Sequence, residues 1–228
     1  MIDLMTSHQE ESHLVEFAYA NFDKIFKTTR LLGGGASARV FLGEFFNGPA
    51  CAKGQTLDEV VENLFVFSPT KSISIFLPIA EGLAEVHSRG IIHNDIKVDN
   101  ILLEKNSDGS YTSHFIDFGL SRVEGGHLTL YSNPNDSHYV PELFKGLPCT
   151  PASDIYSLGV MISDFQNCFD NLWPPGVKRL CNQMLSRNPQ HRPSLSKVIE
   201  VLRESLKELS LEVLSSSKAD PTYHATCV

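Results

Sequence analysis

Hydrophobic residues follow two different periodicities along the chain, which divide it into a strand-rich part and a helix-rich part. Between residues 26 and 53, short apolar runs predict strands at 28–32 and 40–46, joined by a glycine-rich turn at 33–38. From residue 68 onward, apolar residues recur every three or four positions, the spacing that places them on one face of a helix. The pattern predicts antiparallel strands followed by a mainly helical part.

The helix-rich part begins with the strongest apolar stripe of the chain, directly after Ser68-Pro69, which is typical of a helix start. A helix with such a stripe belongs in a core; the stripe consists of Ile73, Ile75, Phe76, Ile79, Ala80, Leu83 and Val86. Further helices are predicted at 56–65, 153–165, 177–185 and 194–214, short strands at 91–92 and 101–103, and a hairpin turn at Asp108-Gly109.

Two polar motifs interrupt this pattern. Residues 93–100 read His-Asn-Asp-Ile-Lys-Val-Asp-Asn, and Asp117-Phe118-Gly119 follows 22 residues after Asp95. A carboxylate that orients a hydroxyl and oxygen ligands that hold Mg²⁺ are the groups that phosphoryl transfer needs. A chance His-x-Asp in a loop would explain the tripeptide alone, but it does not explain Lys97, Asn100 and the later Asp-Phe-Gly together.

The two motifs resemble the catalytic core of the protein kinase family. Val140-Pro141-Glu142, Asp154 and Arg192 match further landmarks of that family, so the resemblance covers about residues 26–206. It implies an α+β, bilobal fold with a reduced β N lobe and a mainly helical C lobe. It also implies that Asp154 braces the backbone of the catalytic loop and that Glu142 and Arg192 form a buried ion pair.

The resemblance divides the chain into four regions: an N-terminal extension at 1–25, a reduced N lobe at 26–55, a C lobe at 56–207, and a tail at 208–228 that we expect to be disordered. The extension is acidic and is expected to be partly helical. The run Thr56-Leu57-Asp58-Glu59-Val60-Val61 reads like the helix that comes after the family's hinge.

The resemblance implies a role for each residue of the motifs. Asp95 would be the catalytic carboxylate and Lys97 would stabilise charge on the transferred phosphoryl group, while Asn100 and Asp117 would hold Mg²⁺.

The same resemblance implies that ATP contacts Gly33, Gly35, Val40, Lys53 and Leu102. The glycine-rich turn carries an alanine where the family has its third glycine, and three glycines are often only a flexible turn. Lys53, taken alone, would be a solvated lysine at a strand end.

Two features depart from the family. Only 42 residues separate Lys53 from Asp95, where the family has roughly 90, so the regulatory helix and the adenine-binding hinge are expected to be missing. Glu59 or Glu62 would have to replace the glutamate that holds the lysine. Asn94 replaces the arginine that binds an activation-loop phosphate, so phosphorylation of that loop is not expected to act through this position.

Composition narrows the choice of partners. The net charge of −8 and pI near 5.6 argue against nucleic acid or an anionic membrane surface. Five scattered cysteines indicate reduced thiols, and no apolar run approaches the length of a membrane span, so a soluble, cytoplasmic protein is expected. Thr226-Cys227-Val228 fits a C-terminal ligand for a PDZ domain, although such endings are frequent by chance.

The sequence therefore predicts a phosphotransferase that moves the γ-phosphate of ATP to Ser or Thr hydroxyls of proteins. The alternative is a catalytically impaired, kinase-like scaffold or shortened variant, as the missing segment favours. Phosphorylation of a small molecule would share the His-x-Asp chemistry but would not explain the landmarks at Glu142, Asp154 and Arg192.

Overall fold

The computed structural model describes most of the helix-rich part and the strands of the N-terminal part. The described backbone comprises residues 2–3, 26–34, 39–45, 48–50, 55–63, 68–128, 140–168 and 173–216. Side chains are described within 55–60, 68–128, 140–167 and 173–211. Gly35, Lys53, the expected helix in the extension and the C-terminal Thr226-Cys227-Val228 lie outside the described residues.

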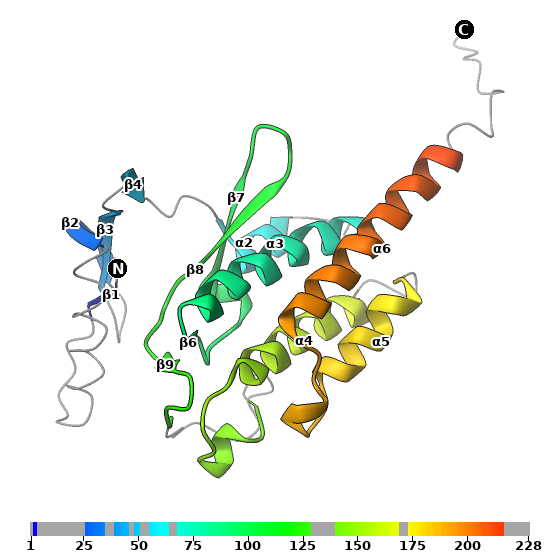
Figure 1. The fold of residues 1–228 in the computed structure, drawn as a ribbon. Helices are drawn as coiled ribbons and strands as arrows, with labels where there is room; N and C mark the ends of the chain where they lie inside the picture. Colours follow the sequence, from blue (N-terminus) through cyan, green and yellow to red (C-terminus); the bar gives the residue numbers. More distant parts are fainter. Residues whose placement is uncertain are drawn as a thin grey trace, which may run out of the picture.

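The N-terminal strands form an antiparallel sheet. β2 (Phe26–Gly34) pairs with β3 (Arg39–Phe45), and β3 also pairs with β1 (Ile2–Asp3) and β4 (Gly48–Ala50). Both strands expected from the sequence are present. Figure 1 shows this sheet in blue, to one side of the helices.

A second antiparallel sheet belongs to the helix-rich part. It has the order β5-β7-β8, formed by β5 (Gln55–Thr56), β7 (Ile101–Lys105) and β8 (Tyr111–Phe115). β7 and β8 make the predicted hairpin, and Gly109 takes a φ of 84° in its turn, a left-handed conformation that favours glycine. Because Gln55 pairs with Leu103, the chain joins the C-lobe hairpin only two residues after Lys53.

Two short strands hold the loops next to this hairpin. β6 (Ile91–Ile92) pairs with β9 (Arg122–Val123), so the chain before the 93–100 motif lies beside the chain after Asp117-Phe118-Gly119. A single 3-10 turn, η1 (Val98–Asn100), leads from that motif into β7. The motifs at 93–100 and 117–119 therefore each lie between strands that are paired.

The helices begin where the sequence provides caps. In α2 (Leu57–Asn63) the Thr56 hydroxyl accepts from the Glu59 N–H at 3.2 Å, and the Glu59 carboxylate accepts from the Thr56 N–H at 3.0 Å. This reciprocal pair is a capping box. In α3 (Pro69–Ser88) the Ser68 hydroxyl accepts from the Lys71 N–H at 3.2 Å.

The remaining helices are α4 (Pro151–Cys168), α5 (Pro175–Met184) and α6 (Leu195–Ser216), with 3-10 turns η2 (Leu143–Lys145) and η3 (Pro189–His191). The predicted helices agree with them apart from a few residues at the ends. The expectation of a disordered tail from residue 208 is wrong for 208–216, because α6 continues to Ser216.

α3 is the central helix of the core. It packs against β8 and against α4 and α6, as Figure 1 shows. Most of its predicted stripe is fully buried, and Phe76 meets Phe165 of α4 edge to face with ring centroids 4.9 Å apart. Burying an aliphatic or aromatic side chain of this size contributes about 1.5–3 kcal/mol, so this stripe is a main source of the stability of the helical part.

α4 and α5 approach each other closely at Gly159. A Cβ at this position would lie 2.7 Å from the Cβ of Met184, which is itself fully buried. Real Cβ contacts are essentially never this short. Glycine is therefore required here by packing and not by backbone conformation.

The ion pair between Glu142 and Arg192 is present and buried, with the two residues 5% and 7% exposed. The guanidinium donates to both carboxylate oxygens, at 2.5 and 2.9 Å, and also to the carbonyls of Ala152 and Ser186 at 2.8 and 2.9 Å. It lies 4.8 Å from the ring centroid of Tyr156. One side chain thus joins η2, the start of α4 and the turn after α5.

We expect Arg192→Met or Glu142→Leu alone to lower the free energy of unfolding by about 3–5 kcal/mol, because each leaves a buried charge without its partner. The double variant should recover part of that loss, since neither charge remains. Urea unfolding of the four proteins measures the coupling. The exposed pair Arg203 and Glu81, with a 2.6 Å contact, is the control, and Arg203→Met should cost less than about 1 kcal/mol. Strictly additive losses at 142 and 192 would contradict the expectation.

Gly159→Ala should lower the free energy of unfolding by about 1–3 kcal/mol, because α4 and α5 must separate to admit the methyl group. Gly176→Ala in α5 is the matched control. There the new Cβ would meet only the Ser205 hydroxyl, at 3.9 Å, so it should be neutral or stabilise by up to about 1 kcal/mol. Thermal and urea unfolding compare the two, and equal effects would show that the close approach at Gly159 has no energetic weight.

Candidate active site

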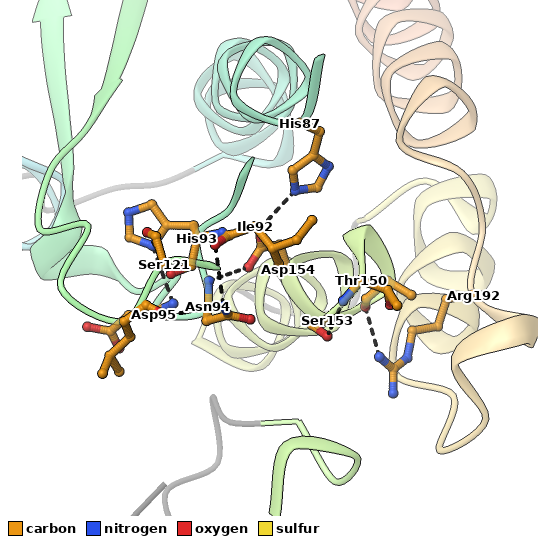
Figure 2. A network of polar contacts seen from close by, with 12 residues as sticks. His87, Ile92, His93, Asn94, Asp95, Ser121, Thr150, Ser153, Asp154 and Arg192 are labelled. Carbon is orange, nitrogen blue, oxygen red and sulfur yellow. Dashed lines mark hydrogen bonds and ion pairs between the residues drawn. The ribbon is translucent and has the colours of Figure 1, made fainter. Parts of the chain in front are cut away.

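The loop at 93–100 is fixed by a buried carboxylate from α4. Asp154 is fully buried and accepts the backbone N–H of His93 at 2.8 Å and that of Asn94 at 2.7 Å. Its Oδ2 also lies 2.8 Å from Nε2 of His87, at the end of α3 (Figure 2). The expected brace between Asp154 and the catalytic loop is therefore present. His87 was not identified from the sequence, where a lone histidine at a helix end gives no signal.

His93 is a structural member of the loop. It is buried, its Nε2 lies 3.1 Å from the carbonyl oxygen of Ile116, and its Nδ1 accepts from the Asp95 N–H at 3.3 Å. With Nδ1 as the acceptor, the proton is on Nε2. Burial lowers the pKa of His93 despite the opposing effect of Asp154, which keeps the ring neutral at pH 7. Its ring centroid is 4.7 Å from that of Phe118.

Asp95, Lys97 and Asn100 lie together. The Asp95 carboxylate, on a residue 5% exposed, accepts from the Asn100 Nδ2 at 2.7 Å and faces the Lys97 ammonium at 3.0 Å. Asn100 Nδ2 also donates to the backbone carbonyl of Asp95 at 2.9 Å. The Lys97 side chain is 33% exposed. The structure therefore brings together three of the residues that the sequence singled out.

Asp117 is placed next to Asn100 by the backbone. The Ile116 N–H donates to the Asn100 carbonyl at 3.0 Å. Asp117 itself has a φ of 59°, a left-handed conformation that is uncommon for residues other than glycine, and its Oδ1 accepts from the Gly119 N–H at 3.2 Å. This backbone conformation sets the direction of the carboxylate after the β8 strand.

The donor set of Asp117 and Asn100 fits Mg²⁺. Both donors of the Asn100 amide group are used on Asp95, so its carbonyl oxygen is the atom that remains for a hard cation. Mg²⁺ is usually held by one or two protein oxygens together with substrate phosphates and water. Accordingly, no group of three or more His, Cys, Asp or Glu able to hold a metal occurs in the part of the chain that the structure describes.

The residues expected to contact ATP are less completely described. Leu102 lies half buried in β7 between buried Ile101 and Leu103. Gly33 and Val40 pair with each other across β2 and β3. Gly35 and Lys53 lie outside the described residues, so all five contacts stay predictions.

The carboxylate of Glu59 caps α2. The sequence had offered it as a partner for Lys53, and the cap is a use that this suggestion did not anticipate. The side chain of the other candidate, Glu62, lies outside the described residues.

The described cysteines do not supply a nucleophile. Cys149 and Cys181 are free and buried. Burial raises the pKa of both thiols, that of Cys181 to about 11, so neither forms a thiolate readily at neutral pH.

Within the described residues, no helix is both long and apolar enough to cross a bilayer.

Known proteins resemble this chain over the same region. The chain is 28% identical over 186 residues to a serine/threonine-protein kinase of Dictyostelium discoideum, a match that covers 67% of this chain and 35% of the relative. It is 28% identical to the serine/threonine-protein kinase Nek5 of Homo sapiens and 30% identical to Nek1 of Mus musculus, each over 160 residues and 59% of this chain. Those matches cover 22% and 13% of the relatives, so the chain spans about a third or less of their length.

The model of the protein kinase domain family matches residues 49–171, more than half of the chain. The matched range contains the catalytic loop, Asp117-Phe118-Gly119, Glu142 and Asp154, and begins after the glycine-rich turn. This family generally uses ATP and Mg²⁺. The braced catalytic loop and the family match agree, and the chain belongs to the protein kinase domain family.

Proposed function

We propose that this chain transfers the γ-phosphate of ATP to serine or threonine hydroxyls of protein substrates. The observation that carries the proposal is the cluster of Asp95, Lys97 and Asn100 on a loop fixed by Asp154. Positioning and charge stabilisation are the main requirements of phosphoryl transfer, because the protein forms no covalent bond in the reaction.

In the proposed mechanism, the Asp95 carboxylate accepts a hydrogen bond from the substrate hydroxyl and orients its oxygen toward the γ-phosphorus. The new oxygen–phosphorus bond forms as the bond to the β-phosphate oxygen breaks, and ADP leaves with that oxygen. Asp95 receives the hydroxyl proton. The Lys97 ammonium, which is 3.0 Å from the Asp95 carboxylate, would stabilise the charge on the transferred group.

Asp117 and Asn100 would hold Mg²⁺ through one oxygen each. When bound, the ion supplies positive charge that neutralises the phosphate oxygens. Hydrogen bonds to Asp95 and to the Gly119 N–H orient these two side chains before any ligand arrives. The serine and threonine preference rests on Lys97, which resembles the lysine of serine/threonine kinases at this position.

The second candidate function is a kinase-like scaffold that binds partners through its C lobe without catalysis. The short interval between Lys53 and Asp95 favours it, since only 42 residues separate them where the family has roughly 90. The chain already pairs with the C-lobe hairpin at Gln55, so a regulatory helix and a hinge have no room directly after Lys53.

Asp95→Asn should lower the rate of phosphate transfer at least 100-fold, because it removes the acceptor for the hydroxyl proton. The measurement is time-dependent transfer of labelled γ-phosphate to a generic basic protein with Mg²⁺. Asp99→Asn makes the same chemical change at an exposed residue of the same loop and should keep at least half of the rate. Equal rates for the parent and Asp95→Asn would assign the transfer to a contaminant, and no transfer by the folded parent would favour the scaffold.

Asp117→Asn should weaken Mg²⁺-dependent ATP binding at least tenfold while leaving metal-free nucleotide binding within twofold, because one carboxylate ligand is lost. Calorimetric titration with ATP, with and without Mg²⁺, measures both without requiring turnover, and Asp99→Asn again serves as the control. Mg²⁺-independent binding in the parent chain would contradict the proposed metal site.

A further inference from the structure

Asn94 occupies a constrained position at the centre of the site. It is 3% exposed, its backbone N–H donates to Asp154 at 2.7 Å, and its φ is 63°. Asparagine is among the few residues other than glycine that adopt this left-handed conformation readily. Both the backbone and the side chain are therefore fixed by their surroundings.

The carboxamide of Asn94 joins the catalytic loop to the segment that follows Asp117-Phe118-Gly119. Its Nδ2 donates to the carbonyl of Ile92 at 3.3 Å and to that of Leu120 at 3.1 Å. In the opposite direction, the Ser121 hydroxyl donates to the carbonyl of His93 at 3.1 Å. Figure 2 shows Asn94, His93 and Ser121 near Asp154. Each of the two chain segments thus provides one side-chain donor to the backbone of the other.

These two side-chain hydrogen bonds lie just outside the backbone pairing of β6 with β9. β6 pairs with β9 from Arg122 onward, and the Ser121 N–H bonds only locally, to Phe118 at 3.0 Å. The Asn94 and Ser121 side chains therefore hold the last residues between Asp117 and the first strand pair. Asp117 itself has a left-handed backbone, so its direction depends on how this short stretch is held.

Asn94 is not explained by stability alone. Its Oδ1 is buried and accepts no hydrogen bond from the described residues, and a buried acceptor without a donor is unfavourable. A residue that keeps such a feature is expected where position matters for function.

We propose that Asn94 is a positioning residue whose carboxamide, together with the Ser121 hydroxyl, fixes the Asp117 segment to the catalytic loop. The Asn94 side chain is closed off from solvent, so its hydrogen bonds to the backbone do not compete with bonds to bulk water. As far as it concerns activity, this inference rests on the proposed function.

The first test measures the link itself. Asn94→Gly keeps the left-handed backbone accessible and removes only the carboxamide. Hydrogen exchange of the full chain should become at least tenfold faster in residues 118–124, with α4 and α6 unchanged. Asn106→Gly is the matched control, because Asn106 donates two side-chain bonds within the exposed β7–β8 hairpin, and it should leave 118–124 within twofold. Unchanged exchange there, or uniform acceleration across the chain, would overturn the proposal.

Ser121→Ala tests the reciprocal link. It should speed hydrogen exchange in residues 118–124. In the double variant with Asn94→Gly, the acceleration of exchange should not exceed the product of the two single accelerations. Normal exchange in Ser121→Ala together with fast exchange in Asn94→Gly would still support the role of Asn94. Normal exchange in both would overturn it.

The second test concerns activity. Asn94→Gly should lower kcat at least tenfold, because Asp117 loses its orientation. It should raise KM for ATP by less than the tenfold loss of ATP binding expected for Asp117→Asn, because the carboxylate itself remains. Asn106→Gly should keep kcat within twofold, and an unchanged kcat in Asn94→Gly would overturn the proposal. If the parent chain transfers no phosphate, the proposed function fails, and the exchange result alone decides the role of Asn94.

Discussion

The active-site region depends on one buried carboxylate. Asp154 has no contact with solvent and accepts two consecutive backbone N–H groups of the catalytic loop, with His87 as its third partner. An unpaired carboxylate at this depth would be strongly unfavourable, so the loop must adopt the conformation that supplies both donors. That conformation includes the left-handed Asn94 and places Asp95 next to Asn100 and Lys97. The position of α4 in the core thus fixes the geometry of the proposed chemistry.

A second buried charge completes the frame around this loop. Arg192 joins Glu142, the start of α4 and the turn after α5 through four hydrogen bonds, and it also contacts the ring of Tyr156. The same helix therefore receives the segment that carries Glu142 and supplies the carboxylate that holds the catalytic loop. Because both interactions are desolvated, they constrain position more than surface ion pairs such as Glu81 and Arg203 do.

The strand-rich N-terminal part and the C lobe differ in how many of the family's features they contain. The C-lobe site has its loop, its brace and its proposed metal ligands in place, whereas the family match begins only at residue 49, after the glycine-rich turn. The distance along the chain from Lys53 to β5 is short, and β5 already belongs to the C-lobe hairpin. Because β5 begins only two residues after Lys53, there is no room between them for a regulatory helix and a hinge.

The sequence by itself determined the elements and the chemistry that depend on local patterns. The apolar stripe of α3, the cap at Ser68 and the Asp108-Gly109 turn were readable because helix and hairpin signals extend over only a few residues. The motifs likewise singled out Asp95, Lys97, Asn100 and Asp117 as candidate site residues, and the resemblance to protein kinases implied the Glu142 and Arg192 pair.

Only the tertiary structure decided how these parts act on one another. The sequence suggested Glu59 as a partner for a lysine, and the fold uses it as a cap for α2. His87 and Ser121 became part of the site, and the Asn94 carboxamide was found to join two segments that are 26 residues apart. Such contacts depend on how α3, α4 and the paired strands pack. Hydrogen bonds between residues distant in sequence leave no periodic signal, so local patterns cannot predict them.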